Sequence, residues 1–203
     1  MGRKFYNFVW SLMKPIYAVL YPPRVYGAEN LPAEGGFILC VNHFSNHDPL
    51  YVSTCIPRDR HMHFLAKKEL FDNKFVRPFV VGLEAIPVDR GHADIAAVRS
   101  AMQVVKEGHA LGIFPQGTRS LDNSPTPMLN GASLFAMRGG VPVIPAYVDG
   151  PYRLFRRTAV RFGSAIDMSA FGKRCDLATL AEVTRHIEAA IWGLRDVGGH
   201  NCK

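Results

Sequence analysis

Short apolar runs alternate with stretches of helical periodicity along most of the chain. After Pro22-Pro23, the apolar runs are short enough for buried strands, and apolar residues at helical spacing lie between them. This alternation is typical of an α/β fold. We therefore predict a single α/β domain with a mixed, mostly parallel central sheet flanked by helices. The predicted strands span residues 37–41, 63–66, 85–88, 110–114, 143–148 and 159–162.

Helical periodicity marks three segments of this domain. Ile95, Val98, Met102 and Val105 recur every three or four residues, and Gly108 provides a C-terminal stop. A second helix is expected to follow residue 131. A third is expected over about residues 177–194.

The N-terminal segment has the pattern of an amphipathic helix with aromatic flanks. Such a helix is typical of a membrane interface, where rings with a polar tip favour the headgroup level. Pro15 is expected to kink or divide it. We assign residues 1–22 to this membrane-associating segment and residues 23–203 to the α/β domain. The apolar face consists of Phe5, Val9, Leu12, Ile16 and Val19. The polar face consists of Lys4, Asn7, Ser11 and Lys14. The aromatic flank between them consists of Tyr6, Trp10 and Tyr17.

The alternative is a terminal helix docked on the core of the domain, because the periodicity is the same in both cases. Lys14 and Pro15 interrupt the longest apolar stretches of the segment, so nothing approaches the ~20 apolar residues that span a bilayer. No small-residue cleavage site follows, and we expect no signal peptide.

Composition and charge narrow the choice of partners. The 203 residues are 48% hydrophobic and 20% charged, as in ordinary globular proteins. The net charge of +7 predicts an anionic partner: nucleic acid, an acidic membrane surface or a phosphorylated substrate. No basic-aromatic recognition motif accompanies the charge, so we expect no nucleic acid. The spacing of Cys40, Cys55, Cys175 and Cys202 favours a reducing compartment without a disulfide framework or zinc site.

A histidine and an aspartate follow the first predicted strand, five residues apart. A carboxylate that accepts a hydrogen bond from one nitrogen of His43 would leave the other nitrogen free to take a proton from a hydroxyl. Asp48 is the candidate carboxylate, and the attacking oxygen can belong to the substrate. Two alternatives remain open at this point: a surface arrangement, and a helix N-cap formed by Asp48 before Pro49.

A metal interpretation of the same region is weaker. It would use His43, His47 and Asp48, with His61 or His63 as a further ligand. No spacing here matches a known zinc pattern, and we predict no metal site.

Two further segments carry groups that suit an anion. Residues 114–120 follow a predicted strand and combine the flexible Gly117, the hydroxyl of Thr118 and the guanidinium of Arg119. Residues 85–90 place Arg90 after another predicted strand. Arginine binds phosphate through a two-pronged donor geometry, and backbone N–H groups near glycine add to it. These segments explain a basic protein without nucleic acid.

In their order along the chain, these segments resemble the 1-acyl-glycerol-3-phosphate acyltransferase family, and the resemblance covers most of the chain. Residues 67–71 (Lys-Lys-Glu-Leu-Phe), a second motif that ends at Arg90, and the proline-containing strand 141–145 are similar to the family. Asn42, His43, Ser45 and Asp48 match the first motif of the family, N-H-x-S-x-x-D. Residues 114–120 match its third motif, F-P-E-G-T-R-S, except at Gln116.

The resemblance implies an acyltransferase in which His43 deprotonates the acceptor hydroxyl and Asp48 orients His43. It implies acyl-CoA or acyl-ACP as donor, a lysophospholipid or glycerol-phosphate acceptor, phosphatidic acid as product and no permanently bound cofactor. It places the protein at the cytoplasmic face of the cell membrane, as a peripheral or monotopic protein. In this interpretation Arg90 and Arg119 hold the acceptor phosphate. The implied substrate-binding residues are Lys67, Arg90, Gln116, Gly117, Thr118 and Arg119.

Two positions depart from the family pattern. Gln116 replaces the usual glutamate, which affects the expected contact with the acceptor glycerol. Residues 128–131 (Met-Leu-Asn-Gly) stand where many members have Phe-Lys-x-Gly. A different acceptor, such as glycerol 3-phosphate or another lysophospholipid, and a catalytically silent membrane-binding protein therefore stay open. A basic group near the C-terminal part is interpreted as a solvated face, with anionic headgroups as the alternative: Arg153, Arg156, Arg157 and Arg161.

Overall fold

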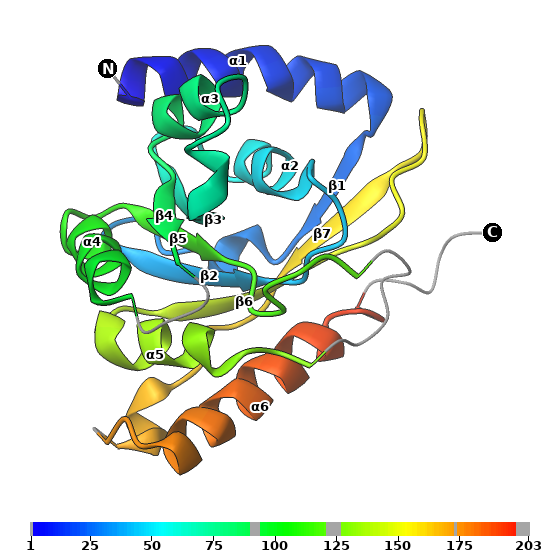
Figure 1. Ribbon diagram of the computed structural model, residues 1–203. Helices are drawn as coiled ribbons and strands as arrows, with labels where there is room; N and C mark the ends of the chain where they lie inside the picture. Colours follow the sequence, from blue (N-terminus) through cyan, green and yellow to red (C-terminus); the bar gives the residue numbers. More distant parts are fainter. Residues whose placement is uncertain (1, 90–93, 121–126, 173, 198–203) are drawn as a thin grey trace.

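The computed structural model describes residues 2–89, 94–120, 127–172 and 174–197. Within these ranges seven strands alternate with six α-helices (Figure 1). The strands are β1 (Pro23–Tyr26), β2 (Phe37–Val41), β3 (Met62–Lys67), β4 (Ile86–Val88), β5 (Ala110–Ile113), β6 (Val143–Val148) and β7 (Thr158–Phe162). The helices are α1 (Gly2–Leu20), α2 (Asp48–Thr54), α3 (Arg77–Gly82), α4 (Ile95–Lys106), α5 (Asn130–Gly139) and α6 (Leu177–Gly193).

The strands form one sheet in the order β1-β7-β6-β2-β5-β3-β4. Neighbouring strands are parallel at every junction except β6–β7, which is antiparallel. The predicted mixed, mostly parallel sheet is confirmed. The carboxyl ends of β2, β5, β3 and β4 therefore lie along one edge, where loops of α/β proteins collect binding and catalytic groups.

Helices cover both faces of the sheet. In Figure 1, α1, α2 and α3 lie on one face and α4, α5 and α6 on the other. The central strand β2 is fully buried and contributes alternate residues to two cores, as the pleat requires. Phe37, Leu39 and Val41 pack in the core beneath α1 and α2, and Ile38 and Cys40 pack against α4, α5 and α6.

The sequence pattern identified six of these strands to within two residues at each end, and it missed β1 and α3. Both are short: β1 has four residues and α3 has six. α3 is too short to show a helical period, and β1 is a partly exposed edge strand that lacks the apolar run of the buried strands. β1 forms because it pairs in parallel with β7, which is distant in sequence.

Helix α1 docks on the domain through its aromatic flank. Tyr6 and Tyr17 are buried in the core with Val9, and the indole N–H of Trp10 donates to the Ser53 carbonyl at 2.9 Å. The expectation that this flank lies at the headgroup level is therefore wrong for the two tyrosines. The Tyr17 ring packs against α2, and the Tyr6 ring packs against the residue just before β3. The docked-helix alternative holds for this side of α1.

The opposite side of α1 keeps an exposed apolar stripe. Phe8, Leu12, Ile16 and Val19 are 37% to 64% exposed. Their spacing of three or four residues places them along one line of the helix. The helix continues through Pro15 without division. Among the described residues no helix is long and apolar enough to cross a membrane.

The predicted solvated face of four arginines is only partly confirmed. Arg153, Arg156 and Arg157 are exposed in the connection between β6 and β7. Arg161 is buried, and its guanidinium donates to Asp149 at 2.8 Å. The prediction is wrong for Arg161 because this residue belongs to β7, whose five residues are all buried.

Candidate active site

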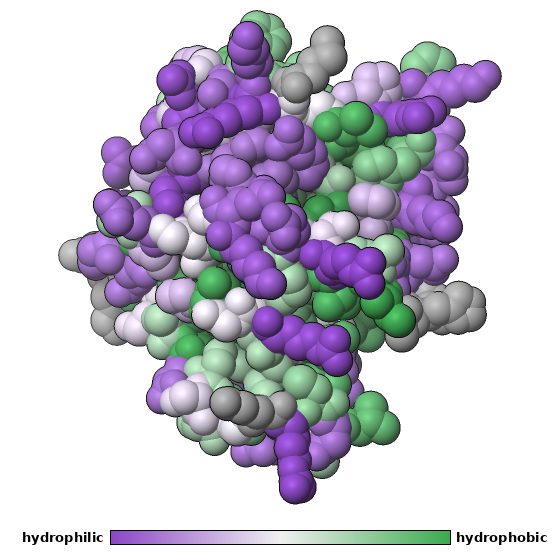
Figure 2. All heavy atoms as spheres, turned by 90° about the vertical axis from the view of Figure 1, so that its left-hand side faces the viewer, coloured by the Kyte–Doolittle hydropathy of each residue, from purple (hydrophilic) through white to green (hydrophobic). Residues whose placement is uncertain are grey.

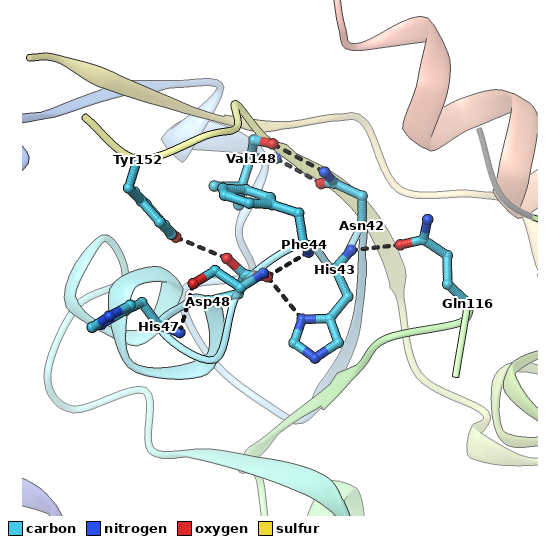
Figure 3. A network of polar contacts seen from close by, with 9 residues as sticks. Asn42, His43, Phe44, His47, Asp48, Gln116, Val148 and Tyr152 are labelled. Atoms are coloured by element: carbon cyan, nitrogen blue, oxygen red, sulfur yellow. Dashed lines mark hydrogen bonds and ion pairs between the residues drawn. The ribbon is translucent and has the colours of Figure 1, made fainter. Parts of the chain in front are cut away.

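Asn42 connects the end of β2 to the end of β6. Its amide donates to the Val148 carbonyl at 2.9 Å, and its Oδ1 accepts from the Val148 N–H at 2.7 Å. The side chain thus replaces a backbone pair where β2 leaves the sheet. Asn42 is fully buried, where hydrogen bonds are stronger than in water. His43 therefore starts from a fixed position at the carboxyl edge (Figure 3).

His43 and Asp48 form the predicted pair. Nδ1 of His43 lies 2.7 Å from Oδ2 of Asp48; the carboxylate is fully buried and the imidazole is 16% exposed. Because an ionised carboxylate only accepts hydrogen bonds, Nδ1 carries the proton and the lone pair lies on Nε2. The arrangement suits proton transfer from a hydroxyl placed at Nε2.

Backbone donors upstream hold Asp48 in place. Its Oδ2 also accepts from the N–H groups of Phe44 and Ser45, at 2.8 and 2.9 Å. Asp48 is the first residue of α2, and His47 occupies the N-cap position. The N-cap alternative is therefore wrong, because the carboxylate turns back toward the loop instead of forward to the first turn of the helix.

Tyr152 supplies another donor to this carboxylate, which the sequence analysis did not identify. Its hydroxyl donates to Oδ1 of Asp48 at 2.9 Å (Figure 3). Burial, and then the charge of Asp48, raise the pKa of the Tyr152 hydroxyl, so the group keeps its proton as a donor. An aromatic residue just beyond the carboxyl end of a predicted strand is the only sequence signal that points to it.

The loop after β5 holds the backbone of His43 from two sides. Oε1 of Gln116 accepts from the His43 N–H at 2.5 Å, and the Ser120 N–H donates to the His43 carbonyl at 2.8 Å. Phe114 stacks on the imidazole with 4.1 Å between ring centroids. Gly117 turns the loop with a φ of +67°, a conformation that favours glycine.

Gln116 is buried and therefore is not exposed to substrate in this structure. The side chain is 3% exposed, and its oxygen is bonded to the His43 backbone. Its Nε2 has no hydrogen-bond partner in the described part of the chain. The structure therefore assigns Gln116 a part in positioning His43, and its contact with the acceptor stays a prediction.

The remaining predicted residues divide into two groups. Thr118 and Arg119 are exposed in the loop that contacts His43, and Lys67 is the last residue of β3 at the same edge. Lys67 Nζ lies 3.9 Å from the exposed Glu69 carboxylate, a weak surface contact. Arg90 lies outside the described residues. Substrate binding by these groups stays a prediction.

An apolar cavity of about 320 Å³ lies beside this edge of the sheet. Phe114 lines it and also stacks on His43, so the cavity and the candidate base share one wall. Figure 2 faces the side of the molecule that carries α4 and shows hydrophobic atoms reaching the surface between hydrophilic ones. The ends of strands and the first turns of α4 and α5 contribute other lining residues, among them Leu65, Val88, Val98, Ile113 and Phe135.

The three cysteines that the structure describes do not take part in this arrangement. Cys40, Cys55 and Cys175 are free, and Cys202 lies outside the described residues. Burial raises the pKa of Cys40 and of Cys55 to about 12. A thiol of that pKa holds almost no thiolate near neutral pH, so neither cysteine suits a nucleophile.

The α/β fold and the buried histidine–aspartate pair suit an enzyme that activates a hydroxyl by general-base catalysis. Residues 22–149 match the model of the Acyltransferase family. The chain is 31% identical over 191 residues to the 1-acyl-sn-glycerol-3-phosphate acyltransferase of Bacillus subtilis (strain 168), an alignment that covers 92% of this chain and 94% of that protein. The chain belongs to the 1-acyl-glycerol-3-phosphate acyltransferase family and is an acyltransferase.

Other comparisons agree with this assignment. The 1-acyl-sn-glycerol-3-phosphate acyltransferase of Streptococcus pneumoniae (strain ATCC BAA-255 / R6) is 26% identical over 182 residues, covering 86% of this chain and 67% of that protein. The crystal structure of the 1-acyl-sn-glycerophosphate (LPA) acyltransferase PlsC from Thermotoga maritima superposes with a TM-score of 0.72 at 20% identity. That superposition covers 99% of this chain and 81% of the other, and it shows a common fold.

Proposed function

We propose that this protein transfers a fatty acyl group from acyl-CoA or acyl-ACP to the sn-2 hydroxyl of 1-acyl-glycerol-3-phosphate and forms phosphatidic acid for phospholipid biosynthesis. The observation that carries the proposal is the 2.7 Å contact between His43 and the buried Asp48. This contact leaves the Nε2 lone pair of His43 for the acceptor hydroxyl. No resident cofactor takes part.

In the proposed reaction, His43 Nε2 takes the proton of the acceptor hydroxyl as the oxygen attacks the thioester carbonyl. Asp48 stabilises the imidazolium that forms, and it stays ionised. When the tetrahedral intermediate collapses, the C–S bond breaks, and the imidazolium returns its proton to the departing thiolate. No covalent acyl-enzyme is needed, because the nucleophile belongs to the acceptor.

The apolar cavity is the proposed site for an acyl chain. Its lining is mostly aliphatic and aromatic, with Asp89 and Asp94 as the charged exceptions, and it shares Phe114 with the candidate base. A chain bound there would gain about 0.8 kcal/mol for each buried methylene. It would also hold the reacting carbonyl or hydroxyl beside His43.

The phosphate of the acceptor is proposed to bind at the same edge through Arg119 and Arg90. Exposed Arg119 belongs to the loop whose Ser120 N–H donates to the His43 carbonyl, so phosphate bound there lies beside the base. Backbone N–H groups near Gly117, the Thr118 hydroxyl and the Lys67 ammonium are the proposed additional donors.

We further propose that the protein lies on the cytoplasmic face of the cell membrane as a peripheral or monotopic protein. The exposed stripe of α1 is the main apolar surface for this contact. The exposed pair Leu154 and Phe155 extends it, because the Phe155 N–H donates to the Leu20 carbonyl, at the C-terminal end of α1, at 2.6 Å. Three exposed arginines flank this pair and suit anionic headgroups: Arg153, Arg156 and Arg157.

A panel assay tests the proposed reaction. The purified protein, in detergent, is given labelled acyl-CoA or acyl-ACP with lysophosphatidic acid, glycerol 3-phosphate, lysophosphatidylglycerol or monoacylglycerol. We expect the original protein to show its highest kcat/KM with lysophosphatidic acid. We expect the His43→Ala variant to show no turnover with any acceptor. A preference for another phosphorylated acceptor would replace the proposed substrate, and no turnover with any acceptor would favour a silent membrane-binding protein.

A further inference from the structure

Three histidines gather at the end of the sheet opposite the candidate active site. His61 directly precedes β3, and His109 directly precedes β5. The two strands pair in parallel with Met62 opposite Ala110, and the Ala110 N–H donates to the His61 carbonyl at 3.0 Å. His61 and His109 are therefore neighbours across the pair. His63 follows two positions later in β3 and points to the same face as His61.

The three imidazoles pack against one another. Ring centroids are 4.4 Å apart for His61 and His63, 5.6 Å for His61 and His109, and 5.4 Å for His63 and His109. One ring nitrogen from each lies within 4.8 Å of the other two. Tyr6 of α1 covers the group, with its ring centroid 4.1 Å from that of His61.

Glu84, between α3 and β4, turns both its carbonyl and its carboxylate toward this group. The Glu84 carbonyl lies 3.0 Å from Nδ1 of His63, and its Oε2 lies 3.7 and 3.9 Å from Nε2 of His61 and of His63. A carbonyl only accepts hydrogen bonds, so Nδ1 of His63 carries the proton and Nε2 carries the lone pair. That lone pair thus faces a carboxylate oxygen, and two acceptors repel unless a positive charge lies between them.

Both Nε2 atoms are buried without a hydrogen-bond partner within the described ranges. His61 is 2% and His63 6% exposed. Burial and the neighbouring histidines lower the pKa of His61 to about 3, and burial lowers the pKa of His63. Neutral imidazoles keep their lone pairs available. The positive charge of Arg3 disfavours a further positive charge on His61, whereas the negative charge of Glu84 favours one on His63.

From this geometry we infer a binding site for a divalent transition-metal ion of the Zn²⁺ type, formed by His61, His63 and His109 with the carboxylate of Glu84 as fourth ligand. Three imidazole nitrogens and one carboxylate oxygen are a ligand set that Zn²⁺ accepts in tetrahedral geometry. The bond from Nδ1 of His63 to a backbone carbonyl is the outer contact that commonly fixes a ligating histidine.

The side chains need only modest movement to close around an ion. Zinc–nitrogen bonds of about 2.0 Å place tetrahedral ligand atoms roughly 3.3 Å apart. Atoms now within 4.8 Å must therefore approach by roughly 1.5 Å at most. His109 is half-buried and Glu84 is 39% exposed, so the ion has a path from solvent.

The site would add a further link between the segment that follows α3 and the paired strands β3 and β5. Glu84 also lies against the start of α1, where its side chain covers Gly2. An ion held by Glu84 and the strand histidines would fasten α3, β3 and β5 beneath the first turns of α1. A structural site is therefore expected, remote from the acyl-transfer chemistry.

The full chain without a histidine tag, stripped with a chelator and reloaded with Zn²⁺ or Co²⁺, tests the inference. Metal content by mass spectrometry, the Co²⁺ absorption spectrum and Tm are the readouts, so the result is independent of the proposed reaction. We expect one ion per chain, a tetrahedral Co²⁺ spectrum and a Tm that rises with metal. His109→Gln and Glu84→Gln, both at partly exposed positions, should each weaken binding at least about tenfold.

His186→Gln, an exposed histidine of α6, is the matched control and should bind as the original chain does. Failure of the original chain to hold an ion, or equal binding by His109→Gln, would leave a neutral histidine cluster with a purely packing role and overturn the inference. Unchanged affinity in Glu84→Gln would overturn the carboxylate as fourth ligand. Loss of binding in His186→Gln would show that the ion sits elsewhere.

Discussion

The Tyr152 hydroxyl donates to Asp48 across 104 residues of sequence, at 2.9 Å, on the carboxylate oxygen that His43 does not use. Asp48 therefore accepts from the imidazole and two backbone N–H groups on Oδ2 and from a phenol on Oδ1. These four donors compensate for the burial of the carboxylate. They also fix the plane in which it meets the imidazole.

Tyr152→Phe should lower kcat by about tenfold and leave the acceptor KM nearly unchanged, because the ring stays and only the donor to Asp48 is lost. A hydrogen bond to a charged group contributes about 1.5 to 3 kcal/mol, so the free energy of unfolding should also fall by that order. Steady-state kinetics and denaturant unfolding measure both. Tyr21→Phe, which alters a ring packed against Tyr152, is the control. Equal kcat in Tyr152→Phe and Tyr21→Phe would show that Tyr152 has no positioning role.

His43→Ala should abolish detectable transfer while the protein stays folded. General-base catalysis contributes about 10²- to 10⁴-fold, and the described residues place no second base at this position. Asp48→Asn should also be severe, since an amide cannot stabilise the imidazolium as a carboxylate does. Activity is compared at equal folded fraction, judged by circular dichroism. Near-normal turnover by folded His43→Ala would remove the proposed mechanism.

Gln116→Glu should change kcat/KM by no more than about tenfold, or roughly 1.4 kcal/mol. A carboxylate oxygen can accept from the His43 N–H as the amide oxygen does, so the base keeps its position. Gln116→Met, which has similar length but no comparable acceptor, should lose more activity than Gln116→Glu. Steady-state kinetics on lysophosphatidic acid compares the three proteins.

The outcome for Gln116 also decides between an enzyme and a silent scaffold. No turnover with glutamine and robust turnover with glutamate would favour the silent scaffold. Equal activity in Gln116→Met and the original chain would show that the bond to the His43 backbone is dispensable.

Arg119→Ala and Arg90→Ala should raise KM for phosphorylated acceptors far more than for monoacylglycerol. A charge-assisted bond lost from a partly enclosed site costs about 1.5 to 3 kcal/mol. Arg185→Ala, at an exposed position on α6, is the control for the loss of one positive charge. Kinetics with lysophosphatidic acid and monoacylglycerol give the ratio. Equal losses with both acceptors would show that neither arginine binds phosphate.

Leu12→Glu and Val19→Glu should weaken binding to vesicles that contain phosphatidylglycerol. Both side chains are at least half exposed, so the changes leave the core intact and remove only the apolar stripe. Ser11→Glu makes the same charge change at the exposed neighbour of Leu12 and is the control. Co-sedimentation measures the bound fraction. Undiminished binding by the stripe variants would place the membrane contact elsewhere on the molecule.

Truncation of α1 is a poorer test than these substitutions. Tyr6, Val9 and Tyr17 of α1 are buried in the core. Removal of the helix would expose that core, and lost membrane binding could not be separated from unfolding. This distinction depends on which side of α1 faces the domain, which periodicity alone left open.

The sequence was sufficient for the longer elements and for the central pair of the site. Strands such as β2 and β6 carry continuous apolar runs because both faces of a parallel sheet are buried. His43 and Asp48 lie five residues apart on one strand-to-helix connection, so local geometry alone allows them to meet. The short elements β1 and α3 depend on partners distant in the chain, and no local pattern records them.

Only the tertiary structure decided which residues from distant segments contact one another. Tyr152 reaches Asp48, and Gln116 reaches the His43 backbone, because β6 and β5 flank β2 in the sheet. The sequence indicated no metal site because His61 and His109 are separated by most of two βα units, yet parallel pairing of β3 and β5 makes them neighbours.

The sequence by itself determined the α/β class, the histidine–aspartate pair and the amphipathic character of the first helix, because each follows from contacts or periods within a few residues. Only the tertiary structure decided how α1 is turned, which donors surround Asp48 and where the histidines meet. Those features depend on strand order and register, which arise from packing free energy summed over the whole core.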